Sequence, residues 1–164
     1  MRAKIQTDAL KNTISFFENL SEKSLDQIPR LYESHARFCD PFNDVIGIDA
    51  INHIFADMFA QLDSPAFVIT TAFEVPAIAT DNEPGVEALA THQAFVTWDF
   101  TFRFKRYKSS ELQTVKGSSH LMFSPNGKLS VHHDYWDAAH QLYERLPVIG
   151  MVMRRLRKKL SSTG

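Results

Sequence analysis

Cysteine is almost absent from the sequence, and other features that would assign a function class at once are missing too. The chain of 164 residues has a single cysteine, Cys39, which excludes an internal disulfide bond. No apolar run approaches the length of about 18 residues that a membrane-spanning helix needs. The first residues lack the apolar centre of a signal peptide, so we expect a cytoplasmic protein.

An excess of charge of one sign is also lacking. Lysine and arginine total 18 against 19 aspartate and glutamate residues, which gives a net charge of −1. This balance argues against nucleic acid as a partner. Basic side chains gather only in residues 148–160, which predict an amphipathic helix without acidic residues. We expect this helix to pack on its own domain or on a partner subunit, and contact with an anionic membrane surface is the alternative.

Metal-binding motifs are absent as well. The sequence has no HExxH pair, and one cysteine cannot supply a paired-cysteine site. A metal site is conceivable around four side chains: Asp40, His120, His132 and Asp134. Their spacing gives no support for it, so we expect neither a metal ion nor another cofactor.

Helical periodicity is present in the first part of the chain. Thr7 can cap a helix that runs to Asn19, along which apolar residues recur at helical spacing. Ser24 and Gln27 resemble a capping box that opens a second, short helix. Residues 49–61 carry one wide apolar stripe and predict the clearest helix of the chain.

Alternating patterns predict the strands. A short extended segment is expected at residues 35–40, and the apolar period changes to two over residues 66–80. The strongest alternation lies in residues 89–107. Residues 117–137 predict a β-hairpin, because two apolar-patterned runs flank an Asn-Gly turn. A last short helix is expected over residues 138–146.

This order of elements favours one fold class. Helices followed by a meander of strands predict an α+β domain over residues 1–147. We expect a cone in which a strongly curved antiparallel sheet packs on the N-terminal helices. Residues 148–164 form the basic helix and a tail outside this domain.

The second arm of the hairpin carries an unusual load of polar and aromatic groups. Side chains alternate along a strand, so they divide into two sets. One face holds His132, Asp134 and Trp136, and the other holds Val131, His133, Tyr135 and Asp137. Whichever face is buried takes a carboxylate and an imidazole with it, and a buried carboxylate is costly unless it is paired. This pattern indicates a pocket lining, with His132 and Asp134 either as an acid–base pair or as a satisfied structural pair.

Asp40 is a second candidate, with two interpretations. It shares a strand face with apolar Phe38, so it is a possible general base carried toward the interior. It could equally cap the turn that starts at Pro41.

Aromatic residues predict the wall of the same pocket. One face of the strongest strand holds Trp98, Phe100, Phe102 and Phe104. Exposing four large rings invites aggregation, so this face is expected to turn inward. Phe17, Phe55, Phe59 and Trp136 are expected to complete the wall. Such a lining suits an apolar, ring-bearing small molecule.

Two stretches resemble the nuclear transport factor 2-like superfamily, which includes ketosteroid isomerase, limonene epoxide hydrolase and SnoaL-like polyketide cyclases. The segment Leu31–Pro41 is similar to the junction of the second helix with the first strand, and Gly127–Asp137 is similar to the final strand. The resemblance covers roughly residues 8–145 and implies the cone of helices closed by a curved sheet. The family hosts many unrelated activities, so each residue is carried over separately.

The resemblance implies roles for two carboxylates. Asp40 matches the place of the general base in ketosteroid isomerase. Asp134 matches a catalytic aspartate of limonene epoxide hydrolase. The oxyanion tyrosine of ketosteroid isomerase would fall near Phe16 or Phe17, and its protonated aspartate near Ser119. Both departures argue against steroid isomerisation. Thr97 stands where limonene epoxide hydrolase has an arginine.

Two functions follow as expectations. The first is a SnoaL-like enzyme without cofactor, an isomerase, lyase or hydrolase. Its catalytic residues would be Asp40, His132 and Asp134. The ligand contacts would be Phe17, Tyr32, Phe55, Phe59, Trp98, Phe100, Ser119, His120 and Trp136. The second is a non-catalytic ligand-binding or protein-interaction module on the same fold. In both cases family resemblance implies a homodimer through the outer face of the sheet.

Overall fold

Most of the helical residues lie in the first part of the chain, and the long strands follow. The computed structural model describes residues 7–76, 92–106 and 110–141. The elements are α1 (Asp8–Glu18), the 3-10 helix η1 (Glu22–Gln27), α2 (Ile28–Leu31), β1 (Tyr32–Cys39), β2 (Asp44–Ile46), α3 (Ile48–Gln61), β3 (Leu62–Pro76), β4 (His92–Phe104), β5 (Gln113–Phe123), β6 (Leu129–Trp136) and α4 (Ala138–Gln141). The α+β class predicted from the sequence is confirmed.

Local signals explain where the helices begin. The Thr7 hydroxyl accepts a hydrogen bond from the Leu10 amide at 3.3 Å and caps α1, as expected. The capping box of the second helical segment lies earlier than predicted. The Ser21 amide donates to Ser24 Oγ at 2.9 Å, so the predicted box at Ser24 and Gln27 is wrong. Because this box starts a tight 3-10 turn, an α-helix begins only at Ile28.

The six strands form one sheet in the order β2-β1-β6-β5-β4-β3. Neighbouring strands are antiparallel except β1 and β6, which run parallel. The strands β3 to β6 form the antiparallel meander that the sequence predicts, and the parallel pair of β1 with β6 makes the complete sheet mixed. The parallel pair brings Phe38 beside His132.

Strand β3 begins earlier than predicted. It starts at Leu62, directly after α3, whereas the sequence predicts a break at Ser64 and Pro65 and a strand from residue 66. Ser64 takes a positive φ of 50°, and the register with β4 shifts between Asp63 and Ala66. Ser64 and Pro65 therefore form a bulge in β3, and the ladder with β4 continues on both sides of it. Because β3 is the edge strand, its prolines remove no hydrogen bond from a central ladder.

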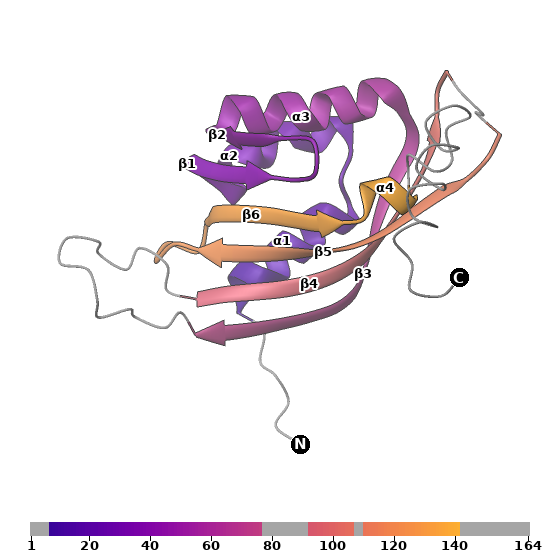
Figure 1. Cartoon of the computed structure of the whole chain (residues 1–164). Helices are drawn as coiled ribbons and strands as arrows, with labels where there is room; N and C mark the ends of the chain where they lie inside the picture. Colours follow the sequence, from indigo (N-terminus) through magenta and orange to yellow (C-terminus); the bar gives the residue numbers. More distant parts are fainter. Residues whose placement is uncertain (1–6, 77–91, 107–109, 142–164) are drawn as a thin grey trace.

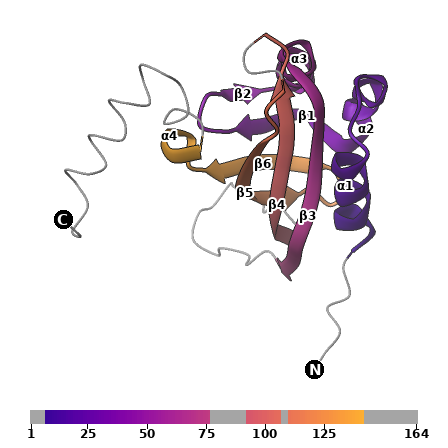
Figure 2. The same ribbon diagram turned by 90° about the vertical axis from the view of Figure 1, so that its right-hand side faces the viewer.

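The sheet is curved and covered by helices on one side. Figure 1 shows the long strands β3, β4 and β5 bending along their length, and Figure 2 shows α1 and α2 on one side of them. Helix α1 buries Leu10, Thr13 and Phe17, and helix α3 buries Ile51, Phe55 and Phe59. The inward side chains of the strands meet these residues in one core. The site described below lies at the centre of this interface.

Some of the predicted elements fall on residues outside the described ranges. The end of the last expected helix, residues 142–146, and the basic segment 148–164 lie outside the described residues. Within the described ranges, no helix combines the length and the hydropathy that a transmembrane segment requires.

Candidate functional site

The register of three neighbouring strands brings the candidate side chains together. Ser119 of β5 pairs with Asp134 of β6, and Leu121 pairs with His132. On the other side, Trp98 of β4 pairs with Gly117 of β5. Alternation then turns all these side chains to the helix-covered face of the sheet, as the sequence analysis expects for His132, Asp134 and Trp98.

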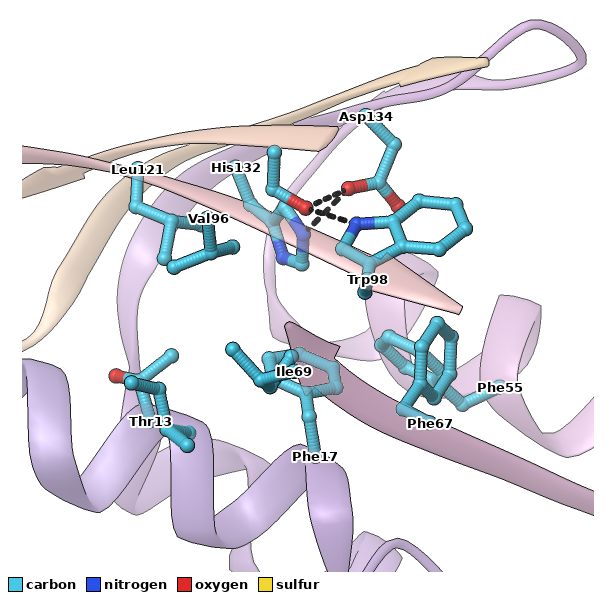
Figure 3. A pocket seen from close by; sticks show the side chains of 12 residues that line it. Thr13, Phe17, Phe55, Phe67, Ile69, Val96, Trp98, Leu121, His132 and Asp134 are labelled. Carbon is cyan, nitrogen blue, oxygen red and sulfur yellow. Dashed lines mark hydrogen bonds and ion pairs between the residues drawn. The ribbon is translucent and has the colours of Figure 1, made fainter. Parts of the chain in front are cut away.

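A chain of hydrogen bonds connects these residues (Figure 3). The indole Nε1–H of Trp98 donates to Ser119 Oγ at 2.9 Å, and the Ser119 hydroxyl donates to Asp134 Oδ1 at 2.5 Å. His132 Nε2 lies 2.9 Å from the same oxygen. Two side chains, Ser119 and His132, therefore hydrogen-bond to Asp134 Oδ1, and they hold the carboxylate in one orientation.

Tyr32 extends this chain into the core. Its hydroxyl lies 2.6 Å from His132 Nδ1, and the residue is completely buried. Burial, and to a smaller extent the charge of Asp134, raise the pKa of the Tyr32 phenol well above its ordinary value. The phenol therefore keeps its proton and donates it to Nδ1. Nε2 then carries the ring hydrogen, which it donates to Asp134.

Aromatic rings fix the His132 imidazole from several sides. The side chain is 4% exposed. Phe38 and Phe17 meet the ring edge-on, with centroids at 5.0 Å and 5.3 Å, and Tyr32 is stacked at 6.0 Å. With both nitrogens hydrogen-bonded and the side chain almost fully buried, His132 orients Asp134 rather than reaching toward a ligand of its own.

Asp134 lines two cavities on the helix-covered side of the sheet, besides an open pocket lined by Asp40, Pro41 and residues 133–137. The inner one has a volume of about 30 Å³, room for a water molecule, and lies between α1 and the sheet. Its lining includes Thr13, Phe17, Val96, Leu121 and His132 (Figure 3). The larger one, which we call the main cavity, has a volume of about 540 Å³, within the range of small-molecule sites. Asp134, Trp98, Phe55 and Phe67 line both.

The main cavity has apolar walls. Its wall residues from the sheet are Phe67, Trp98, Phe100, Phe102, Phe104, Val115 and Trp136, and those from α3 include Ile54, Phe55 and Met58. This confirms that the aromatic face of β4 turns inward. Trp98 is also wedged against bare backbone. A Cβ atom built on Gly117 would lie 2.5 Å from Cζ2 and 2.9 Å from Cζ3 of the indole, so only glycine at this position lets the ring lie where it does.

The second oxygen of Asp134 is the reactive atom that the geometry offers. The side chain is 15% exposed. Among the described residues Oδ1 takes both hydrogen bonds, and no fully buried polar side-chain atom there lacks a partner. Oδ2 therefore reaches the open space that Asp134 lines. A carboxylate fixed through one oxygen and open through the other can accept a proton from a bound molecule.

Asp40 lies at the rim of the main cavity but is engaged in its own turn. Its Oδ1 accepts from the amides of Phe42 and Asn43, each at 2.7 Å, and the Asn43 side-chain amide contacts both oxygens at 3.1 Å. These contacts match the turn-capping interpretation. Asp40 is therefore less available than Asp134 to accept a proton from a bound molecule.

The structure brings most of the expected residues together, but not all. Phe17, Phe55, Trp98, Phe100, Ser119 and Trp136 line one cavity or both. Tyr32 lies behind His132, and Phe59 is a core residue of α3 outside both linings. His120 is turned to the outer face, where its Nε2 lies 2.6 Å from Gln93 Oε1, because it alternates with Ser119 and Leu121. Its expected ligand contact is therefore wrong.

Sequence reasoning missed the parts of the site that depend on register. It did not find the partner role of Tyr32, the wall residue Phe67 or the bare backbone at Gly117. A metal site from Asp40, His120, His132 and Asp134 is ruled out by the outward turn of His120, and within the described residues no cluster of metal-ligating side chains occurs.

Removing the Tyr32 hydroxyl tests the hydrogen-bond chain. In Tyr32→Phe, Nδ1 of His132 loses its donor inside the core, so we expect a loss of about 1–3 kcal/mol in unfolding free energy at neutral pH. In the wild type, the unfolded phenol loses its proton near pH 10 while the folded one keeps it. The folded state then binds more protons, and its stability falls as the pH rises. In urea unfolding, the difference in unfolding free energy between the wild type and Tyr32→Phe should shrink by about 1.4 kcal/mol per pH unit above about pH 10. A gap independent of pH would contradict the assigned phenol.

Comparisons with known proteins place this geometry in a fold. No protein-family model and no curated protein matches the chain. Solved structures do. An NTF2-like protein of unknown function from Exiguobacterium sp. 255-15 superposes with a TM-score of 0.59 at 16% identity, covering 79% of this chain and 98% of that one. A candidate SnoaL-like polyketide cyclase from Jannaschia sp. CCS1 gives 0.59 at 14% identity, with coverage of 84% and 90%.

A third neighbour is a protein with a ketosteroid isomerase-like fold from Catenulispora acidiphila DSM 44928, in complex with trimethylamine. It superposes with a TM-score of 0.61 at 12% identity, covering 84% of this chain and 91% of that one. At such identities the likeness concerns the fold, which agrees with the resemblance seen in the sequence. The chain has the nuclear transport factor 2-like fold that SnoaL-like and ketosteroid isomerase-like proteins share.

Proposed function

We propose that the chain is an enzyme that moves a proton on an apolar, ring-bearing small molecule without a cofactor. One observation carries this proposal. The carboxylate of Asp134 is fixed through Oδ1 by Ser119 and His132, Oδ2 has no hydrogen-bond partner among the described residues, and the side chain lines a cavity of about 540 Å³ with aromatic walls. A fixed base beside a bound substrate is the arrangement that general base catalysis needs.

The roles divide among the residues as follows. Asp134 Oδ2 accepts a proton, either from a carbon of the substrate or from a water that attacks it. His132 and Ser119 hold the carboxylate, and Tyr32 holds His132 in the matching tautomer. The aromatic walls place the ring of the substrate and keep water away from the base. Returning the proton to another carbon gives an isomerase, loss of a leaving group gives a lyase, and attack by water gives a hydrolase.

The experiment is a search for proton exchange. The purified protein is incubated in D₂O with a panel of ring-bearing ketones, protonated cyclic imines and epoxides, and the products are followed by proton NMR. We expect deuterium at the carbon next to the C=O or C=N group, or a diol from an epoxide, faster than in buffer. Binding of panel members without exchange or turnover of any would favour the alternative, a ligand-binding or interaction module.

Two further expectations stay predictions: the homodimer through the outer face of the sheet and the location in the cytoplasm. The outer face exposes apolar groups that a partner could cover, among them Val68 and Tyr135, which are 54% and 51% exposed. Light scattering at high micromolar concentration would decide whether the chain forms a dimer.

A further inference from the structure

We propose that the molecule bound in the main cavity is a cation, the protonated or quaternary form of an apolar, ring-bearing amine or imine. The inference rests on the proposed function in one respect, because it takes Asp134 as the group that faces the ligand. It goes further by assigning the charge and the chemical class of that ligand. Three independent features of the cavity lead to it.

The first feature is a carboxylate without a cationic partner. Tyr32 is completely buried, and His132 is the one hydrogen-bond partner of its hydroxyl among the described residues. An imidazolium would donate from both nitrogens and leave the phenolic hydrogen without an acceptor, so we assign His132 as neutral from this hydrogen-bond arrangement. Asp134 then carries a negative charge in a largely buried place. Such a charge is costly unless a positive group pairs with it, and a cationic ligand can be that group.

The second feature is the character of the walls. Phe67, Trp98 and Phe100 stand side by side, with Phe67 stacked on Phe100 at 4.3 Å and edge-on to Trp98 at 5.5 Å. The faces of such rings attract ammonium groups, Trp most strongly. Among the described residues no lysine or arginine lines the main cavity, whereas Asp40, Asp57 and Asp134 do. His53 also lines the cavity, paired with Asp57 at 3.4 Å. The excess of carboxylates disfavours an anionic ligand and favours a cation.

The third feature concerns the electron pair that remains on the ligand when Asp134 removes a proton from it. Removing a proton beside a carbonyl group requires donors for the oxyanion that forms. Behind Asp134 the Trp98 indole is engaged with Ser119 and the Tyr32 phenol with His132, which leaves the Trp136 indole as the one tryptophan donor that faces the main cavity without a hydrogen bond among the described residues. A protonated imine needs no such donor. Its carbon–hydrogen bond next to C=N⁺ breaks, the proton goes to Asp134 Oδ2, and the freed electron pair forms a C=C bond. The C=N π pair becomes the lone pair of a neutral enamine nitrogen.

The test compares two ligands of nearly the same shape, benzyltrimethylammonium and its uncharged isostere neopentylbenzene. Binding to the full-length protein is followed by NMR of the tryptophan indole N–H signals, because Trp98 and Trp136 both line the main cavity. We expect the cation to bind at least about tenfold more tightly. Asp134→Asn should remove most of this preference. Asp99→Asn, which removes the same charge from the outer face, should keep it.

Each result has a defined meaning. The inference is overturned if the isostere binds as tightly as the cation to the wild type, if neither ligand binds at millimolar concentration, or if folded Asp134→Asn keeps the preference. The wild-type comparison stands even if that variant does not fold. Failure of the proposed function is separate. A protein that exchanges ketone protons but prefers the isostere refutes only the cation, and one that binds the cation without any exchange refutes only the enzyme.

Discussion

Replacing Asp134 by asparagine is expected to slow proton exchange on the best panel substrate by about 10²–10⁴-fold, the usual contribution of a general base. The amide has nearly the same shape as the carboxylate. Its oxygen can still accept from Ser119 and His132, which now bond to Asp134 Oδ1 at 2.5 Å and 2.9 Å. The atom that replaces Oδ2 is a donor, however, and it has no lone pair for a proton.

The stability of this variant separates a catalytic role from a structural one. If Asp134 serves catalysis, the unfolding free energy of Asp134→Asn should lie within about 1 kcal/mol of the wild-type value, because the removed charge has no cationic partner to lose. If the pair with His132 serves stability, breaking it should cost about 3–5 kcal/mol. Exchange rates and urea unfolding are measured on the same samples. Asp99→Asn is the control for charge, because it removes a carboxylate that pairs with Lys116 on the outer face of the sheet. An exchange rate within threefold of the wild type would remove Asp134 from the mechanism.

Alternation along the strands made the faces of the sheet predictable. The period of two in β4 is determined by burial on one side alone, so Trp98 and Phe102 could be assigned inward, and both are 5% exposed. The same rule assigned His132 and Asp134 to one face of β6. Period alone, however, gives no partner strand. The parallel pairing of β1 with β6 joins segments far apart in the chain, and no local pattern encodes it.

The hydrogen-bond chain of the site depends on register, and register was the limit of prediction. Tyr32 meets His132 only because β1 lies beside β6, and it stands at the junction of α2 with β1, where no periodicity marks a side chain as inward. The pairing of Ser119 with Asp134 follows from the hairpin turn, but the bulge between Met122 and Phe123 shifts it by one residue. Without that shift, Ser119 would face a different neighbour.

Asp40 illustrates a different limit. A carboxylate before Pro41 suits both a base and a turn cap, so the sequence leaves both interpretations open. The two interpretations differ only in where the amides of Phe42 and Asn43 point, and both donate to Asp40 Oδ1. Backbone direction within a turn of a few residues follows from the complete loop rather than from one side chain. Family resemblance favours the base at this position, whereas the hydrogen bonds of the turn favour the cap.

A methyl group at position 117 is expected to destabilise the protein by about 2–4 kcal/mol. In an ordinary strand Gly→Ala is neutral or stabilising, because alanine has less freedom in the unfolded chain. Here the added Cβ of Gly117→Ala would overlap the six-membered ring of Trp98, at 2.5 Å from Cζ2. The ring is 5% exposed and cannot move aside freely. Overpacking of a core costs about 1–3 kcal/mol, and a displaced indole also loses its hydrogen bond to Ser119, worth about 1 kcal/mol more.

A double-mutant cycle with Trp98→Phe shows whether this contact is the cause. The overlapping atoms Cζ2, Cη2 and Cζ3 all belong to the outer ring of the indole, which phenylalanine lacks. Gly117→Ala should therefore cost little in the Trp98→Phe background, and the double variant should be more stable than the sum of the single effects predicts by about 1–3 kcal/mol. Urea unfolding of the four proteins gives this coupling energy. Additive effects would mean that the indole does not rest on Gly117, and that the wall between the two cavities is held in some other way.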